Sequence, residues 1–273
     1  MTELNNQRPK EPFFFLKPTT SYTTSGTPVE IPRGVDLHHE GALLCVRSRN
    51  SIRMLNYDVA VPTVELGVVI GSRARDVSQA DAMQHVAGYC LAIDYTARNM
   101  QNDVKKKGLP WSAVKGFDTF CPVRSRSLPR LATTTSLSVF RLSHRSRTFS
   151  PLQLSRTLTT FVCGVSRDTG AQQSRSTADL RTTGCTDKVN GETRQNESSA
   201  LMLFQIPRLI EHCSSIMTLE EGDLLLTGTP AGVSRIVAGD KVEAGLEQDG
   251  ELIASIKHDT VDRQGGYSFT SGA

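Results

Sequence analysis

The stretch covering residues 64–101, VELGVVIGSRARDVSQADAMQHVAGYCLAIDYTARNMQ, contains the elements that decide the fold. Its first eight residues, VELGVVIG, have the β-branched and apolar composition of a strand. Residues 89–96, YCLAIDYT, form a mostly apolar run of strand length, which predicts a second, buried strand. The residues that follow, ARNMQNDVKKK, predict a helix that is stopped by Gly108 and Pro110.

Shorter patterns outside the two strands complete the expected architecture. Ser78 is placed to cap a short helix over residues 79–87, and Pro207 suits the first turn of a second helix. The sequence GDLLLTGTPAGV predicts a strand followed by a tight Gly/Pro turn, and DKVEAGLE alternates like a half-buried strand. The expected strands outnumber the short helices, which indicates a β-rich α+β fold.

Composition sets broad limits on the class of protein. The chain has 273 residues, of which 38% are hydrophobic and 22% charged, so it can bury a core. It has no apolar run of membrane-spanning length, and its N-terminus resembles neither a signal peptide nor a presequence. The six cysteines include no Cys-x-x-Cys pair, which favours reduced thiols and a cytosolic or mitochondrial matrix protein.

Residues 124–187 differ in composition from the rest of the chain. They contain ten arginines, no lysine and three acidic residues, with many serines and threonines. No apolar period of 2 or 3.6 residues persists through them. A basic arm for nucleic acid or another polyanion is one interpretation. A disordered, solvated insert is the favoured alternative, because aromatic residues that could stack on bases are nearly absent.

Three carboxylates lie in or beside the predicted strands. If Glu40 stood two residues before Glu65, both side chains would leave the same face of the strand. Asp94 lies near the end of a buried apolar run, where an unpaired carboxylate is very unfavourable. An all-oxygen set of this kind suits Mg²⁺ or Mn²⁺. The alternative is that each acid pairs with an Arg or Lys on the surface.

Further polar residues have two interpretations each. Of the adjacent His38 and His39, at most one can join Glu40, because neighbouring strand residues point to opposite faces. A neutral core or supporting histidine is the favoured role. Lys115, in an apolar setting, either extends its ammonium group to water or is poised for chemistry, and in isolation the first is favoured. The Gly-rich turn around Thr229 can hold an anion with backbone amides or form an ordinary bend.

Six motifs occur in one order along the chain: FFFLKPTTSY, EIPRGVDLHHE, the stretch 64–101, KKKGLPWSAVKGFDTFCPV, VNGETRQ and LLLTGTPAGV. Together they cover about two thirds of the chain and resemble the fumarylacetoacetate hydrolase family, in its acylpyruvase and oxaloacetate-handling branch. The resemblance implies a roll of mixed β-sheets, a homodimer, and one catalytic domain over residues 1–273.

The resemblance also implies a metal site and catalytic residues. Glu40, Glu65 and Asp94 match the family's carboxylate ligands for a divalent cation, expected to be Mg²⁺ or Mn²⁺. Lys115 would add positive charge or donate a proton. Glu3 matches the glutamate of a His–Glu pair that activates water in a lid segment.

The implied substrate is a small 2-oxo acid. Arg98 and Gln101, spaced on one helix face, would hold its carboxylate and carbonyl groups, and Thr229 would contact its other end. The implied reactions cleave C–C bonds by acylpyruvate hydrolysis or oxaloacetate decarboxylation. The alternatives are oxaloacetate keto–enol tautomerisation and a catalytically impaired non-enzyme with a basic arm. A mitochondrial matrix or cytoplasmic protein is expected, without membrane contact and without a nucleic-acid partner.

The chain departs from the family pattern in three places. One residue separates the two glutamates in the family, whereas residues 41–63 lie between Glu40 and Glu65 here. Residues 124–187 take the place of a family strand with a longer, dissimilar segment. The histidine expected with Glu3 would precede Met1. These departures resemble a mis-annotated gene, with non-coding sequence retained twice and a start codon chosen too late.

Overall fold

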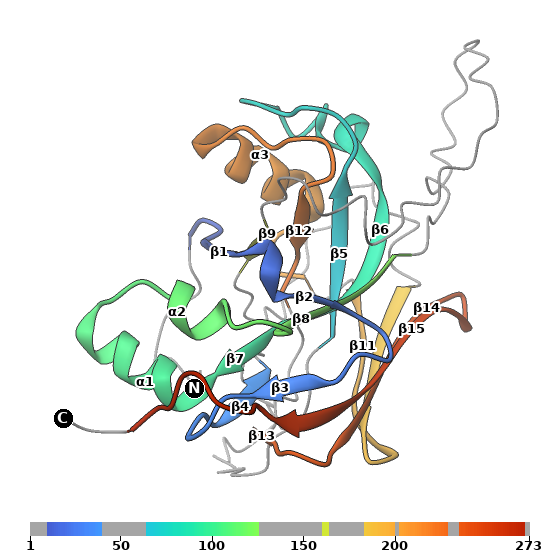
Figure 1. Cartoon of the computed structure of the whole chain (residues 1–273). Helices are drawn as coiled ribbons and strands as arrows, with labels where there is room; N and C mark the ends of the chain where they lie inside the picture. The colour runs from blue at the N-terminus through green and yellow to red at the C-terminus, as the bar shows by residue number, and fades with distance from the viewer. Residues whose placement is uncertain are drawn as a thin grey trace, which may run out of the picture.

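A computed structural model of the chain describes residues 10–39, 64–125, 160–163, 183–199, 202–228 and 235–270. The described residues form mixed sheets with a few short helices (Figure 1), so the predicted β-rich α+β fold is confirmed. No helix in these ranges has both the length and the apolar character needed to cross a membrane.

The largest sheet has seven strands in the order β1-β9-β12-β5-β6-β8-β2. These strands are β1 (Phe14–Lys17), β9 (Thr160–Cys163), β12 (Leu224–Leu226), β5 (Val64–Ile70), β6 (Val86–Ile93), β8 (Cys121–Ser125) and β2 (Tyr22–Thr24). Its central pair is antiparallel, whereas β9 runs parallel to β12 and β2 runs parallel to β8. The sheet is therefore mixed in direction and carries β1 at one edge.

A five-stranded sheet and a three-stranded sheet complete the described fold. The five-stranded order is β11 (Glu192–Ser198), β10 (Thr183–Val189), β14 (Lys241–Gln248), β15 (Glu251–Asp262) and β3 (Val29–Ile31). The three-stranded order is β13 (Arg235–Ile236), β4 (Leu37–His39) and β7 (Tyr95–Ala97). The helices are α1 (Arg98–Lys107), α2 (Ser112–Lys115) and α3 (Ile206–Ile216), with 3₁₀ turns η1 (Thr19–Ser21) and η2 (Ala82–His85).

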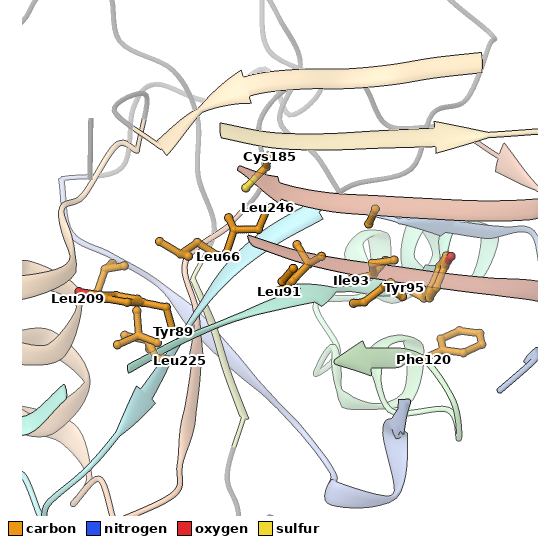
Figure 2. Close-up of a cluster of buried hydrophobic side chains, with 14 of the residues drawn as sticks. Leu66, Tyr89, Leu91, Ile93, Tyr95, Phe120, Cys185, Leu209, Leu225 and Leu246 are labelled. Carbon is orange, nitrogen blue, oxygen red and sulfur yellow. The ribbon is translucent and has the colours of Figure 1, made fainter. Parts of the chain in front are cut away.

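The main core lies on the face of the seven-stranded sheet that meets the five-stranded sheet (Figure 2). Alternation along β6 places Tyr89, Leu91 and Ile93 together on this face. Leu246 of the five-stranded sheet packs in the same core, and Leu209 of α3 packs near Tyr89 (Figure 2). Full burial of one such leucine or isoleucine stabilises the fold by about 1.5–3 kcal/mol.

The opposite face of the seven-stranded sheet carries a smaller apolar cluster. Its buried members are Cys90, Ala92, Cys121, Val123, Leu224 and Leu226, and Phe15, Tyr22 and Val69 pack against them. Glu65 shares this face with Val69, and Asp94 follows Ala92 by two residues, so strand alternation brings both carboxylates to this side.

Several predicted elements are confirmed. The strand predicted from VELGVVIG is β5, the apolar run that follows is β6, and the alternating residues Val242, Ala244 and Leu246 are buried in β14. Helix α1 ends where predicted, because Gly108 adopts a left-handed conformation with φ of 64° that closes the helix. Pro207 lies in the first turn of α3, as predicted, and the helix ends at Ile216.

The helix predicted over residues 79–87 is wrong. Only the 3₁₀ turn η2 forms there, and β6 begins at Val86. The Ser78 hydroxyl does bond to Asp81, at 2.8 Å from its carboxylate. Pairing of Val86 with Ile70 of β5 extends the sheet, and this tertiary contact outweighs the local helical preference.

Three of the described strands have residues in the range 124–187, and the first of them, β8, ends there at Ser125. Strand β9 pairs with both β1 and β12, and the residues up to Asp187 of β10 pair with β11 and β14. The interpretation of a disordered, solvated insert therefore does not apply to residues 160–163 and 183–187.

Candidate active site

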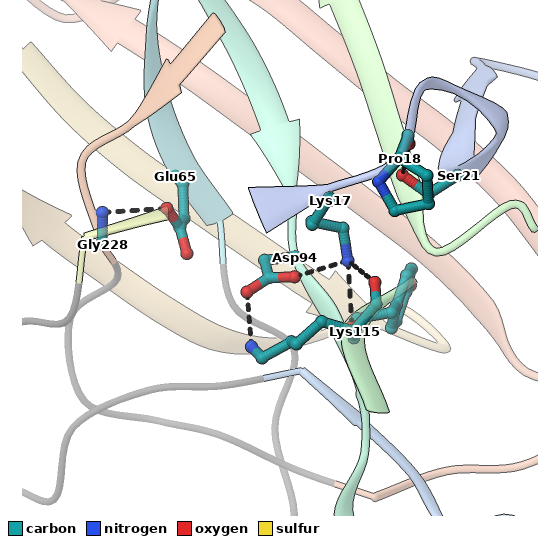
Figure 3. Close-up of polar contacts among 8 residues, drawn as sticks. Lys17, Pro18, Ser21, Glu65, Asp94, Lys115 and Gly228 are labelled. Atoms are coloured by element: carbon teal, nitrogen blue, oxygen red, sulfur yellow. Dashed lines mark hydrogen bonds and ion pairs between the residues drawn. The ribbon is translucent and has the colours of Figure 1, made fainter. Parts of the chain in front are cut away.

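Two lysines and two carboxylates are buried together on the face of the seven-stranded sheet that carries the smaller apolar cluster (Figure 3). Lys17 ends β1, Glu65 follows the first residue of β5, Asp94 lies between β6 and β7, and Lys115 ends α2. Their exposed fractions are 2%, 1%, 0% and 0%. Because an unpaired buried ion costs several kcal/mol, these four groups can coexist only by compensating one another.

Asp94 is the centre of this cluster. Its Oδ1 accepts a hydrogen bond from Lys17 Nζ at 2.8 Å, and its Oδ2 accepts one from Lys115 Nζ at 2.5 Å. Burial by itself would raise the pKa of Asp94, but the charges of Lys115 and Lys17 outweigh this effect and hold the pKa below its ordinary value. Asp94 is therefore a fixed negative charge between two ammonium groups.

Glu65 is held differently. It accepts one hydrogen bond from the Gly228 amide at 2.8 Å (Figure 3). Burial and the neighbouring charge of Asp94 raise the pKa of Glu65 to about 8, although Lys115, the Gly228 amide and Lys17 oppose the rise. Glu65 pairs with Ala92 across the sheet, and this register sets it diagonally opposite Asp94.

The donor set fits a hard divalent cation. Glu65 and Asp94 offer the carboxylate oxygens that Mg²⁺ and Mn²⁺ prefer, and each Asp94 oxygen keeps a lone pair besides its lysine contact. Burial is the largest cause of the raised pKa of Glu65, and a bound divalent cation would favour the ionised, ligating form of this carboxyl group. Within the described ranges no group of three or more His, Cys, Asp and Glu could hold a metal ion. Glu40, the third predicted ligand, lies outside those ranges.

Lys115 does not extend to water. Its side chain is fully buried, and Nζ lies 4.6 Å from the centre of the Phe15 ring as well as against Asp94. The interpretation that Lys115 extends its ammonium group to water is therefore wrong, and its catalytic role stays a prediction. An ammonium group between a carboxylate and an aromatic face is fixed in position.

Lys17 is the residue that sequence reasoning missed. Its Nζ reaches Asp94 and also donates to the carbonyl oxygens of Tyr95, at 3.3 Å, and Lys115. A usable signal was present, because Lys17 follows the run FFFL in a strand and a charged residue there needs a buried partner.

Arg98 and Gln101 contact each other on α1. Arg98 Nη1 donates to Gln101 Oε1 at 2.9 Å, and Gln101 is buried with 4% of its surface exposed. The helix that carries them starts four residues after Asp94, so both side chains project from the chain just beyond the cluster. Their predicted role toward a substrate stays a prediction.

His38 lies on β4, close to Arg98. Burial, followed by the positive charge of Arg98, lowers the pKa of His38 to about 4, which keeps the ring neutral at physiological pH. This agrees with the favoured role of a neutral histidine. His39 is the last residue of β4.

The remaining predicted residues lie outside the described ranges. These are Glu3, Glu40 and Thr229. The start of the Gly-rich turn is described, and there Gly228 has a φ of 87° that favours glycine. The Gly228 amide donates to the Glu65 carboxyl group, so one backbone donor of the Gly-rich turn is used within the protein.

The cluster can stabilise a developing negative charge. Lys115 places an ammonium group in a buried environment, where electrostatic interactions are stronger than in water. Asp94 holds that ammonium group, and Lys17 holds Asp94. An arrangement of this kind suits a reaction that forms an enolate or another oxyanion.

Comparison with known proteins places the chain in a family of enzymes. The family profile described as Fumarylacetoacetate (FAA) hydrolase C-terminal matches residues 1–257. "Oxaloacetate decarboxylase, mitochondrial" of Dictyostelium discoideum is 36% identical over 246 residues, 89% of this chain and 82% of the relative. "Oxaloacetate tautomerase FAHD1, mitochondrial" of Arabidopsis thaliana is 38% identical over 245 residues, 89% of this chain and 79% of the relative. The prediction of an enzyme family is therefore confirmed.

Solved structures show the same fold. A yeast protein, ynq8, described as a fumarylacetoacetate hydrolase family protein, matches with a TM-score of 0.66 and 28% identity over 95% of this chain and 89% of that chain. A putative fumarylacetoacetate isomerase/hydrolase from Oleispira antarctica matches with a TM-score of 0.65 and 27% identity, over 95% of this chain and 87% of that chain. Sequence motifs, fold and relatives agree, and the chain belongs to the fumarylacetoacetate hydrolase family.

Proposed function

We propose that the chain catalyses keto–enol tautomerisation and decarboxylation of oxaloacetate, two reactions that share an enolate. The observation that carries this proposal is the buried ion pair of Lys115 and Asp94, at 2.5 Å, beside Glu65. Relatives named for each of the two reactions support the choice of substrate.

Both reactions develop negative charge on the oxygen at C2 of oxaloacetate. In tautomerisation a proton leaves C3 and another reaches that oxygen. In decarboxylation the C3–C4 bond breaks, carbon dioxide leaves, and the bonding electron pair enters the enolate. Lys115 stabilises the charged oxygen and can donate a proton to it. Asp94 keeps the Lys115 ammonium group in place.

A divalent cation, Mg²⁺ or Mn²⁺, is part of the proposal. The ligands we propose are Glu65, Asp94 and Glu40. When bound, the cation supplies Lewis acidity toward the 2-oxo carboxylate. The chain's own carboxylates provide the negative charge that attracts it, and burial of Glu65 and Asp94 keeps competing water away.

Orientation of the substrate is assigned to the start of α1 and to the Gly-rich turn. Arg98 offers a guanidinium fork suited to a carboxylate, and Gln101 offers an amide suited to a carbonyl group. Thr229 would contact the far end of the substrate. Hydrolysis of acylpyruvates, a third candidate reaction, also requires a base for water, and Glu3 would supply part of it.

The wider setting follows from the same family. We propose a single catalytic domain over residues 1–273, with residues 41–63 and 124–187 as atypical inserts, that assembles as a homodimer. Several relatives are named as mitochondrial, and we propose the same compartment for this chain. Light scattering of the purified protein and localisation of a tagged chain test these two points.

The test of the activity measures both proposed reactions of oxaloacetate. Enol loss is measured by ultraviolet absorbance and pyruvate by a coupled dehydrogenase, each with Mg²⁺ and with a chelator. Lys115→Met, which keeps the length but removes the charge, should lower kcat by about 10²–10³-fold. The matched control Lys10→Met changes an exposed lysine and should retain the parent rate. Parent protein that leaves both reactions at their uncatalysed rates in Mg²⁺ contradicts the proposal.

A further inference from the structure

Every N–H donor of the Lys17 ammonium group is used within the protein. The group carries three donors. One meets Asp94 Oδ1 at 2.8 Å, one meets the Tyr95 carbonyl oxygen at 3.3 Å, and one meets the Lys115 carbonyl oxygen. With these three acceptors in place, the ammonium group has no donor left to offer a substrate.

These three contacts join segments that are distant in sequence. The acceptors are 77, 78 and 98 positions from Lys17 and lie where β6 passes into β7 and where α2 ends (Figure 3). Other contacts also fix these segments, among them the 2.8 Å hydrogen bond between the Tyr95 hydroxyl and His258 Nε2 and the pairing of Tyr95 with His39. The Tyr95 amide donates to the Phe120 carbonyl at 3.0 Å, and the Lys115 amide donates to Trp111 within its own turn at 3.2 Å.

The main chain of Lys17 is itself fixed in a sheet. Lys17 is the last residue of β1 and pairs with Thr160 of β9, which in turn runs parallel to β12. Phe15, on the same face of β1, lies under the Lys115 ammonium group. One strand therefore contacts Lys115 at two places, through a ring at its side chain and through an ammonium group at its main chain.

We propose that Lys17 is a positioning residue, whose ammonium group fixes the Asp94 carboxylate and the Lys115 main chain so that the Lys115 side chain meets the substrate in one orientation. The inference rests on the proposed function, because it assigns Lys115 to the reacting oxygen. It differs from simple neutralisation of Asp94, which would require no contact with either carbonyl group.

Two variants and one matched control separate these roles. Lys17→Met removes the charge and all three donors while keeping the side-chain length. Lys17→Arg keeps the charge but replaces the compact ammonium group by a planar fork that cannot meet the same three acceptors. Leu16→Ala is the control, because Leu16 lies on the same strand, is 37% exposed and has no role in the cluster.

The first readout is steady-state kinetics on oxaloacetate. Lys17→Met should lower kcat by at least tenfold with KM changed by less than twofold, because the substrate does not touch Lys17. Lys17→Arg should recover part of the lost kcat, and Leu16→Ala should match the parent. A raised KM with unchanged kcat in Lys17→Met would show direct substrate contact and overturn the proposal.

The second readout does not depend on activity. Amide hydrogen exchange in peptides covering residues 94–120 should be faster in both Lys17 variants than in the parent and in Leu16→Ala, with the remaining peptides unchanged. If Lys17→Met does not fold, Lys17→Arg decides the question by the same measurements. Parent-like exchange in this region overturns the inference. If the parent itself is inactive on oxaloacetate, the proposed function fails, while the exchange comparison still decides the role of Lys17.

Discussion

Asp94 and Asp187 are both fully buried, yet their surroundings give them opposite properties. Asp94 lies between two ammonium groups, and their charges keep its pKa below the ordinary value although burial opposes this. Asp187 lies on β10, and neither of its oxygens has a hydrogen bond of normal geometry with any described group. Burial raises the pKa of Asp187 to about 8, and only the Lys188 amide and the Arg194 charge oppose it.

The difference shows that burial does not identify a functional carboxylate. The partners of the carboxylate decide whether it is held as an anion for chemistry or carried as a protonated acid that weakens the fold. Asp187 stands opposite Gln195 and Ala244 in the five-stranded sheet, and neither of these cross-strand partners carries a charge. Four changes to the chain test this contrast.

Removing the Asp94 carboxylate should have the largest effect. Asp94→Ala leaves two buried lysines without their shared anion, which should lower the free energy of unfolding by about 3–5 kcal/mol. It should also abolish stabilisation by Mg²⁺, measured as the shift in Tm on adding the ion. Equal Mg²⁺ stabilisation of variant and parent would exclude Asp94 as a ligand.

Replacing Asp187 should raise the free energy of unfolding rather than lower it, and the size of the effect should depend on pH. With a folded pKa of about 8 against an ordinary value of 3.8, the folded state binds more protons between these values. Stability from this group is therefore complete at low pH and is lost as pH rises toward 8, by at most about 1.4 kcal/mol per pH unit. Asp187→Asn should reduce this decline and raise stability at pH 8 by about 1–3 kcal/mol.

Urea unfolding at several pH values measures both effects. Part of the loss of stability with rising pH should remain in the Asp187→Asn protein, because the pKa of Glu65 is also raised to about 8. Asp94 contributes with the opposite sign, because its folded pKa is lowered and its stabilisation is lost as pH falls. An unchanged pH slope in Asp187→Asn would show that this carboxylate finds a partner in solution.

Deleting residues 41–63 tests whether a carboxylate with well-placed partners, as at the proposed metal site, binds Mg²⁺ more tightly. The deletion would bring Glu40 to the spacing that the family motif requires, with one residue between it and Glu65. Because ligand positions must hold to within about 0.2 Å, we expect Mg²⁺ to bind at least tenfold more tightly, about 1.4 kcal/mol. Calorimetry compares the two proteins. Parent protein that binds at least as tightly identifies residues 41–63 as a native loop.

The Phe15 ring should give the smallest effect. Phe15→Leu keeps an apolar side chain but removes the aromatic face that lies 4.6 Å from Lys115 Nζ. Cation–π contacts contribute roughly 0.5–2 kcal/mol, so kcat should fall by about two- to thirtyfold while the fold is kept. Val69→Leu is a control on the same apolar cluster. A parent-like kcat in Phe15→Leu would limit the ring to packing.

The regular elements were predictable because local pattern and tertiary structure agree. Strands β5 and β6 have apolar, β-branched sequences, and α1 ends at a glycine that adopts a left-handed conformation. The helix predicted over residues 79–87 was wrong because the pairing of Val86 with β5 cannot be deduced from the local sequence. Strand β9 was missed for the same reason, since its four residues gain their order from β1 and β12.

Single charged residues were harder to predict than elements. Asp94 and Lys115 could be proposed because family motifs surround them, but the environment of Lys115 could not be derived from its neighbours in sequence. Lys17 was missed because its acceptors lie at least 77 positions away. Asp187 was missed because a polar stretch before a Gly-containing turn resembles an exposed hairpin, and only the sheet register shows that the residue is buried.

The hydrogen bond from the Gly228 amide to Glu65 spans 163 positions of the chain. At a synthesis rate of about 5–20 residues per second, roughly 8–33 s pass on the ribosome between the addition of Glu65 and that of Gly228. During this interval Glu65 lacks the backbone donor that holds its carboxyl group, whereas Lys17, Asp94 and Lys115 have all been added before residue 116. Completion of the site therefore comes late in synthesis, and a nascent chain that stalls before Leu224 leaves Glu65 without its Gly228 donor and β5 without its partner strand β12.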